Sequence, residues 1–383
     1  MTYFRLTLTR TLAIGLAVSV IALSACRAKP FQTLVRGVMS IDGDMGVNGD
    51  MNVGGNMSMD GSMKMSGDVS ASMKTDNTAS RLVSIPVYTG ANPDTAAARR
   101  IAVLDVDGLL LNKNISGFGS LGENPVALFR EKLDMVATDP SVAALVLRIN
   151  SPGGGVTATD VMTRDLQQVK AQLKIPVVAC IMDVGAGGGY YLATAADVIV
   201  AHPTSLVGGV GVILNVYNLE DGLGQFGVVS IPIKAGERID VASPERMMEA
   251  EERALLQEIA DSFHERFKTR VAAARVHLES KDILDGRVMT GGDALEYGLV
   301  DQLGYLDDAV VLARQLSHAP ENTPLVMFRR DNDRAYTLLD VTPNTPTTSS
   351  ILPLKMPGLD RSSLPTFLYM WQPEPSMVSS GGG

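Results

Sequence analysis

The sequence is poor in the residues that build metal centres, disulfide frameworks and nucleic-acid surfaces. Its 383 residues include two cysteines and four scattered histidines, too few for a Cys/His metal site or a disulfide scaffold. The net charge is −9 and no Lys/Arg-rich cluster occurs, which argues against binding of nucleic acid. A Gly-Lys-Ser/Thr phosphate loop is also missing. The sequence therefore predicts no cofactor, no metal and no nucleic-acid partner.

Long apolar runs are missing as well. The longest uncharged apolar stretch, "TLAIGLAVSVIAL", has 13 residues, whereas a transmembrane helix needs ~20. Arg5 and Arg10 precede it, as in the positive region of a signal peptide. The stretch ends in "LSAC", which resembles the lipobox of bacterial lipoproteins. This resemblance predicts a signal peptide over residues 1–25, lipid on Cys26, and an anchored domain outside the cytoplasm in the bacterial cell envelope. A plain secretory signal with a chance cysteine is the alternative.

Residues 26–98 are low in aromatic side chains and rich in Gly, Asp, Asn and Met. Five copies of a hexad, Met-x-apolar-x-Gly-polar, cover residues 39–68. We interpret the stretch as a tether. A solenoid turn takes ~18 residues, so thirty residues make fewer than two turns, and solenoids typically need three or more. Two alternatives are a short β-stack that forms oligomers and copper(I) capture by the thioethers of "MSM" and "MKM".

From residue 99 the sequence predicts an α/β domain. Apolar runs such as "IPVVACIM" alternate with helical patterns, which favours a largely parallel sheet over residues 99–318. Thr157 or Thr159 is the candidate N-cap of one helix, and a charged helix is expected over about 244–275. Residues 319–383 are Pro/Ser/Thr-rich and predicted to be irregular. Their aromatic cluster, "FLYMW", would cover either a peptide groove or a subunit interface.

Four motifs in this domain carry a family resemblance. In order they are "RINSPGGGVTA", "DVGAGGGYYLATAAD", "AHPTSLVGGVGV" and "DGRVMTGGDALEYGLVDQLG". Together they closely resemble the signal peptide peptidase A (protease IV) family, which has the Clp-protease/crotonase fold of repeated ββα units. The resemblance covers about residues 99–316. It implies a serine peptidase scaffold and a homo-oligomeric ring, as in short family members with one peptidase domain.

The resemblance also shows which catalytic groups this chain lacks. The family nucleophile is a serine in Ala-Ser-Gly-Gly-Tyr, and here Gly187 takes its place. The family base is a lysine in a segment that matches "KAGERIDVASP", and here Ile239 takes its place. A further serine of the family is replaced by Gly155. Backbone N–H groups at Gly153 and Gly188 match the family's oxyanion hole.

These substitutions predict a catalytically inactive homologue that binds extended peptides or regulates an active paralogue in a mixed ring. One alternative is an active endopeptidase that degrades signal peptides or membrane-protein fragments through Ser205 and Lys234. A crotonase-like use of the oxyanion hole, with Asp183 as the acidic group nearby, is another. The last alternative is a purely structural envelope protein that assembles through its Met-rich hexads.

Overall fold

A computed structural model describes residues 81–87, 99–117, 120–331, 337–340 and 367–371. The predicted signal peptide, Cys26 and the Met-rich hexads lie outside the described residues. Among the residues that are described, no helix is both long and apolar enough to cross a membrane. The same part of the chain holds no group of His, Cys, Asp and Glu side chains that could bind a metal ion.

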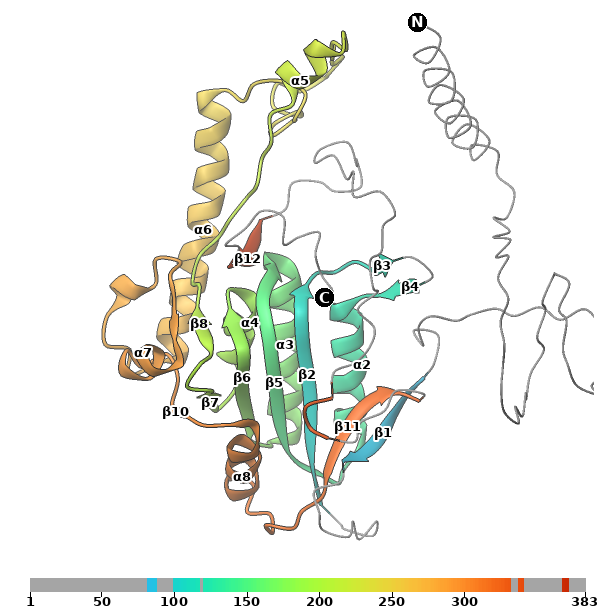
Figure 1. The fold of residues 1–383 in the computed structure, drawn as a ribbon, viewed down its shortest axis with the longest axis vertical. Helices are drawn as coiled ribbons and strands as arrows, with labels where there is room; N and C mark the ends of the chain where they lie inside the picture. Colours follow the sequence, from blue (N-terminus) through green and yellow to red (C-terminus); the bar gives the residue numbers. More distant parts are fainter. Residues whose placement is uncertain (1–80, 88–98, 118–119, 332–336, 341–366, 372–383) are drawn as a thin grey trace, which may run out of the picture. The chain divides into compact units, whose positions relative to one another are not determined.

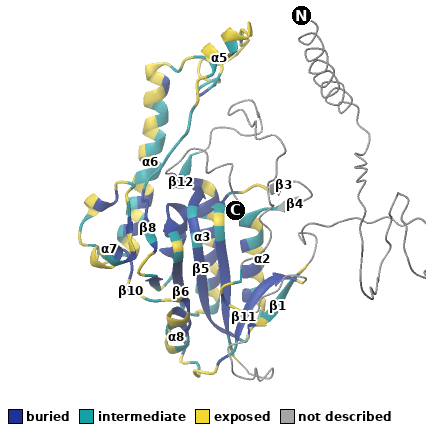
Figure 2. Ribbon diagram, in the orientation of Figure 1, coloured by how far each residue is buried: buried dark blue, intermediate teal, exposed yellow. Residues whose placement is uncertain are grey.

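A ten-stranded, mostly parallel sheet forms the centre of the domain (Figure 1). The strands β2 (Arg100–Leu110), β5 (Val142–Gly155), β6 (Val177–Ala186) and β7 (Val198–Ala201) lie side by side and parallel. Their apolar runs are buried almost throughout, as expected of strands covered on both faces (Figure 2). The predicted α/β class with a largely parallel sheet is confirmed.

Helices cover both faces of this sheet and create two cores. The larger core packs α2 (Pro125–Thr138), α3 (Val156–Leu173) and α4 (Gly188–Ala193) on one face, and the smaller one packs α8 (Leu306–Leu316) on the other. The side chains of β5 alternate between the cores, as the pleat requires. The remaining elements are β3 (Ile115–Gly117), β4 (Ser120–Glu123), β8 (Leu206–Gly208), α5 (Glu220–Gln225), α6 (Ala250–Ala274), η1 (Lys281–Ile283), β9 (Val288–Thr290), α7 (Gly291–Glu296) and β10 (Gln302–Leu303).

The sheet extends beyond the predicted domain limits at both ends. β1 (Leu82–Val87), inside the stretch predicted to be tether, pairs antiparallel with β11 (Leu325–Arg330), inside the tail predicted to be irregular. β11 in turn runs parallel to β2. The sequence does not predict this strand, because "LVMFRR" ends in two arginines and a buried strand is expected to be apolar. Arg330 is nevertheless buried, because it forms ion pairs with Glu123 and Glu131.

Two predicted helix starts are wrong. The N-cap of α3 is Gly155, which has no side chain to donate or accept, whereas Thr159 lies buried within the helix. The long charged helix, α6, begins at Ala250 instead of near residue 244. Its start is fixed by a capping box between Glu249 and Glu252, in which a glutamate takes the N-cap position that Ser, Thr, Asp or Asn usually occupies.

Residues 214–249, here called the arm, contain α5 and lead into α6. In Figure 1, α5 lies at the end of α6 that is distant from α4. The arm contains few buried residues (Figure 2). Its exposed side chains include large apolar ones: Phe226, Val229, Ile231, Ile233, Ile239 and Met247. Exposed apolar side chains in this number are typical of surfaces that contact other molecules.

Candidate functional site: a glycine-lined peptide groove

Two glycine-rich turns meet at the ends of β5 and β6. β5 ends in Gly153–Gly155 and leads directly into α3, and β6 is followed by Gly187 and then by α4. The register of the two strands places Ser151 opposite Gly185, so the two turns lie next to each other. Because the strands are parallel, both turns are at the same edge of the sheet.

Gly187 connects β6 to α4 by a sharp turn. Its φ is +50° and its ψ is −122°, a conformation in which side chains are strained and glycine is not. The Gly187 N–H donates to the Gly208 carbonyl at 3.0 Å, and its carbonyl accepts from the Tyr191 N–H at 2.9 Å. A strained turn between a strand and a helix is also how serine hydrolases expose a nucleophile. Here the residue in the turn has no side chain, and Gly187 is buried.

The two predicted oxyanion-hole donors differ in their surroundings. The Gly153 N–H donates to Ser151 Oγ at 3.1 Å, and that hydroxyl donates to the Gly108 carbonyl at 2.6 Å. Gly153 thus has a partner within its own turn. Gly188 is the first residue of α4, where N–H groups have no partner inside the helix. The Ser151 contact was missed, although Ser151 belongs to the "SPGG" motif.

A short strand from the C-terminal tail, β12 (Leu368–Met370), crosses these turns (Figure 1). It is antiparallel to β5, with Tyr369 opposite Gly154 and Met370 opposite Gly153. Its other edge forms a bridge with Ile213. The aromatic cluster therefore lies between β5 and the chain at Ile213, and we call this place, with the two glycine turns beneath it, the groove.

The carbonyl of Tyr369 lies directly over the glycine turns. A Cβ added at Gly153 or at Gly187 would overlap the Tyr369 carbonyl oxygen. The Cβ at Gly153 would also lie 2.6 Å from the Gly188 nitrogen, so the carbonyl and this N–H are on the same side of Gly153. Glycine at both positions brings backbone close to a peptide carbonyl, as the sequence suggests.

Comparisons with known proteins concern the family of this chain. Residues 169–319 match the sequence model of peptidase family S49. A candidate signal peptide peptidase SppA of Enterococcus faecium is 32% identical over 218 residues, 56% of this chain and 63% of that protein. Protease 4 of Salmonella typhi is 34% identical over 247 residues, 64% of this chain and 38% of that protein. Residues 169–319 thus belong to peptidase family S49, and the chain is similar to proteins of the signal peptide peptidase A family.

The match leaves part of each relative uncovered, because this chain spans less than two thirds of the length of either one. Among solved structures, a membrane-bound stomatin-specific protease in complex with a substrate peptide is 15% identical with a TM-score of 0.36. The superposed region covers 58% of this chain and 84% of the protease chain. The region matched to family S49 includes Gly187 and Ile239, whereas Gly153 precedes it.

In this S49 chain, Ile239 lies on the arm and not in the groove. Its side chain is 73% exposed. The neighbouring Lys234 is engaged with Asp240, Nζ to Oδ1 at 2.7 Å, and with the carbonyl of Glu237. Arg246 also binds Asp240, and together these cations hold the pKa of the Asp240 carboxyl far below its usual range. Lys234 is thus held by an acidic partner within the arm.

Ser205 is unsuited to act as a nucleophile. It is fully buried, and its hydroxyl donates to the carbonyls of Ile181 and Met182. A hydroxyl with two backbone acceptors and no exposed surface stabilises a turn. The Ser205–Lys234 pair is therefore not assembled within one chain, since each group has other partners.

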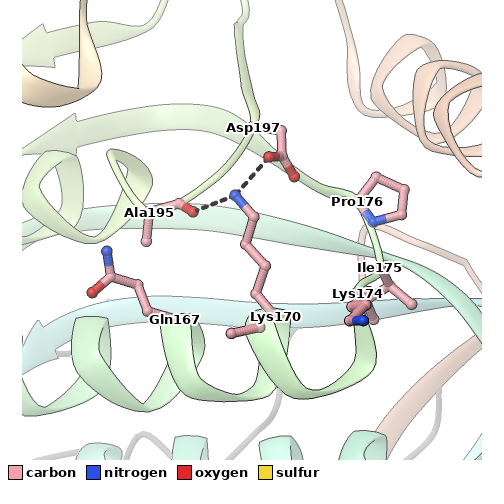
Figure 3. Close-up of a pocket in the computed structure, with 8 residues that line it drawn as sticks. Gln167, Lys170, Lys174, Ile175, Pro176, Ala195 and Asp197 are labelled. Atoms are coloured by element: carbon pink, nitrogen blue, oxygen red, sulfur yellow. Dashed lines mark hydrogen bonds and ion pairs between the residues drawn. The ribbon is translucent and has the colours of Figure 1, made fainter.

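Two further polar side chains, Asp183 and Lys170, have partners within the protein. Asp183 lies within β6, exposed, and its carboxylate accepts from Asn150 at 3.2 Å. A hollow at the other end of α3 holds Lys170, whose Nζ is 2.6 Å from Asp197 Oδ1 (Figure 3). Lys170 is about 20 Å along the helix axis from the turn at Gly155, at 1.5 Å per residue. The hollow is not part of the groove.

Proposed function

We propose that this chain is a catalytically silent signal peptide peptidase A-like protein that binds extended peptides in the groove. A lipid on Cys26 would anchor it to a membrane of the bacterial cell envelope. One observation carries the proposal. An extended segment with backbone partners on both edges lies over Gly187, where no nucleophilic side chain exists.

The chemistry is missing on two counts. Glycine at position 187 has no hydroxyl to attack the carbonyl above it, and isoleucine at position 239 has no proton acceptor. In a serine protease, removing the nucleophile alone lowers turnover by ~10⁶-fold. The Gly188 N–H still lies on the side of the peptide carbonyl, which supports binding without cleavage.

Turnover of a generic fluorogenic peptide by the detergent-solubilised mature protein tests this. We expect no turnover in the wild type. A side chain at 187 would overlap the backbone of the tail strand. The restoration Gly187→Ser with Ile239→Lys therefore needs a third change, Tyr369→Ala, which removes the buried side chain of that strand and should release it. Turnover in this triple variant and not in the wild type would support a peptidase scaffold that lacks only its nucleophile and its base. Turnover in the wild type would refute the proposal.

The protein would act on active paralogues through mixed rings. The resemblance implies rings that combine a serine from one subunit with a lysine from its neighbour, and this chain would supply neither. The exposed apolar side chains of the arm support a role in assembly. Co-expression with an active paralogue should lower the peptidase activity of that paralogue. Unchanged activity in a mixed complex isolated by tag would reject the regulatory role.

A further inference from the structure

Residues 209–213, here called the second wall, form the side of the groove opposite β5. At its end, the Ile213 N–H donates to the Leu368 carbonyl at 3.0 Å, and the Ile213 carbonyl accepts from the Leu368 N–H at 2.9 Å. At its start, the wall continues directly from β8, whose last residue, Gly208, accepts from the Gly187 N–H. The second wall therefore joins the glycine turn to the edge that pairs with an extended segment.

The second wall packs on the chain that precedes β9. The Gly209 N–H donates to the Arg287 carbonyl at 2.7 Å. A Cβ added at Gly211 would lie 3.1 Å from the Gly286 Cα, so the two backbones are in close contact there. Because both segments lie outside the regular strands at this point, these contacts alone do not fix them to the rest of the domain.

One side chain connects both segments to α6. The Nε2 atom of His264 lies 2.8 Å from the Val210 carbonyl oxygen and 2.8 Å from the Leu284 carbonyl oxygen. Val210 and Leu284 are buried, and neither carbonyl accepts another hydrogen bond from the residues that the structure describes. A buried carbonyl without a donor is costly. Removal of this ring nitrogen would therefore leave two buried acceptors without a partner.

The two contacts also fix the position of a proton. A carbonyl oxygen only accepts hydrogen bonds, so Nε2 of His264 must carry a hydrogen, which the two oxygens share. The amide nitrogen of glutamine is the same number of bonds from Cα as this ring nitrogen, and it carries a hydrogen for each carbonyl. Asparagine is one methylene shorter and cannot reach both. Glutamine should therefore replace His264, and asparagine should not.

We propose that His264 is a positioning residue of the groove, which holds the second wall where Ile213 can pair with a bound peptide. The same turn of α6 lines the groove, because the Phe263 carbonyl accepts from the Tyr369 hydroxyl at 2.7 Å and the Phe267 ring contacts the Tyr369 ring. One helix thus sets both the wall and the pocket beside it. This proposal rests on the peptide-binding function proposed above.

Hydrogen exchange of the full chain, followed by mass spectrometry, tests the wall itself. In His264→Asn the amides of residues 209–213 should exchange about 10-fold faster than in the wild type, the value of one hydrogen bond. His264→Gln should restore slow exchange. His277→Asn, the same change at an exposed histidine, should leave it unaltered. Wild-type exchange in His264→Asn, or fast exchange in His264→Gln, would overturn the positioning role.

Peptide binding separates this role from the proposed function. A fluorescein-labelled Phe-Leu-Tyr-Met peptide is titrated by anisotropy into the full chain that carries Tyr369→Ala, which opens the groove. Adding His264→Asn should weaken binding by about 10-fold, and adding His264→Gln should not. Equal affinity in all three proteins would overturn the positioning role. Binding to none of them, with the exchange difference present, would instead overturn the proposed peptide-binding function.

The wild-type protein provides a test that needs no folded variant. An NMR spectrum of the histidine ring nitrogens at neutral pH should show His264 with its hydrogen on Nε2 and slow exchange of that hydrogen with solvent. A ring with its hydrogen on Nδ1 alone would overturn the proposal, because Nε2 would then have nothing to donate to the two carbonyls.

Discussion

The groove and the arm each contain one of the two positions where the family resemblance places a catalytic group, and they differ in every physical respect. Gly187 is buried in a turn with fixed backbone bonds and has a peptide carbonyl above it. Ile239 is 73% exposed on a segment with few buried neighbours. A change at 187 must disturb what lies on it, whereas a change at 239 meets solvent. Position 187 is therefore constrained by the backbone of its own chain, whereas position 239 has no such constraint within one chain.

The largest effect should come from the buried core beneath the groove. Lys132 of α2 and Asp105 of β2 form an ion pair at 3.0 Å, with side chains only 2% and 3% exposed. Lys132→Ala removes a buried ammonium from its carboxylate, so we expect a loss of about 3–5 kcal/mol in the free energy of unfolding. Urea denaturation measures this.

The control for Lys132 is an ion pair in which both partners are exposed. Arg287 pairs with Asp285 at 2.6 Å, and their side chains are 56% and 47% exposed. Arg287→Ala should therefore lower the free energy of unfolding far less than Lys132→Ala does. Equal losses in the free energy of unfolding for the two variants would show that burial does not determine how much these ion pairs stabilise the fold.

Gly187→Ser should have the next largest effect. The positive φ alone costs a side chain on the order of 1–3 kcal/mol, and the overlap with Tyr369 adds to it. Adding Tyr369→Ala should relieve the overlap but leave the strain. Thermal unfolding of the single and double variants measures both contributions. A Gly187→Ser protein as stable as the wild type would contradict the claim that position 187 is constrained and position 239 is not.

The start of α6 should show a smaller, pH-dependent effect. Hydrogen bonds from Arg246 and from the Glu249 N–H lower the pKa of Glu252 from 4.5 to about 2. A lowered pKa stabilises the folded state above pH 4.5, and this contribution is lost as the pH falls toward 2. The stability difference between wild type and Glu252→Gln should shrink over that window. A difference that stays constant from pH 5 to pH 2 would contradict the assignment.

Ile239→Lys should have the smallest effect. An exposed surface position tolerates substitution within about 0.5 kcal/mol, and lysine at 239 should also raise solubility. Thermal unfolding of the purified variant checks this. A loss above about 1 kcal/mol would mean that Ile239 packs against another copy of the chain, and the arm would then be buried in an assembly.

The sequence predicts the part of the site that depends on local pattern. Buried strands such as "IPVVACIM" and the glycine turns that follow them are visible in short stretches of sequence, and the structure has both. Alternation of buried strands and helices was sufficient for the α/β class.

The part that could not be predicted depends on distant pairing. Tyr369 faces Gly154 across more than two hundred residues of sequence, and no local pattern specifies that register. Three residues of β12 are also too few for a periodic signal. Thr159 was predicted as an N-cap because the sequence cannot show that Gly155 already begins the helix against the tail.

Reaction with an activated-serine phosphonate, followed by intact-mass analysis, tests the absence of a nucleophile most directly. The account predicts no adduct on the wild-type protein and one adduct, at position 187, on the triple variant Gly187→Ser, Ile239→Lys, Tyr369→Ala. An adduct on any serine of the wild type, such as Ser205, would contradict the account and identify an active peptidase.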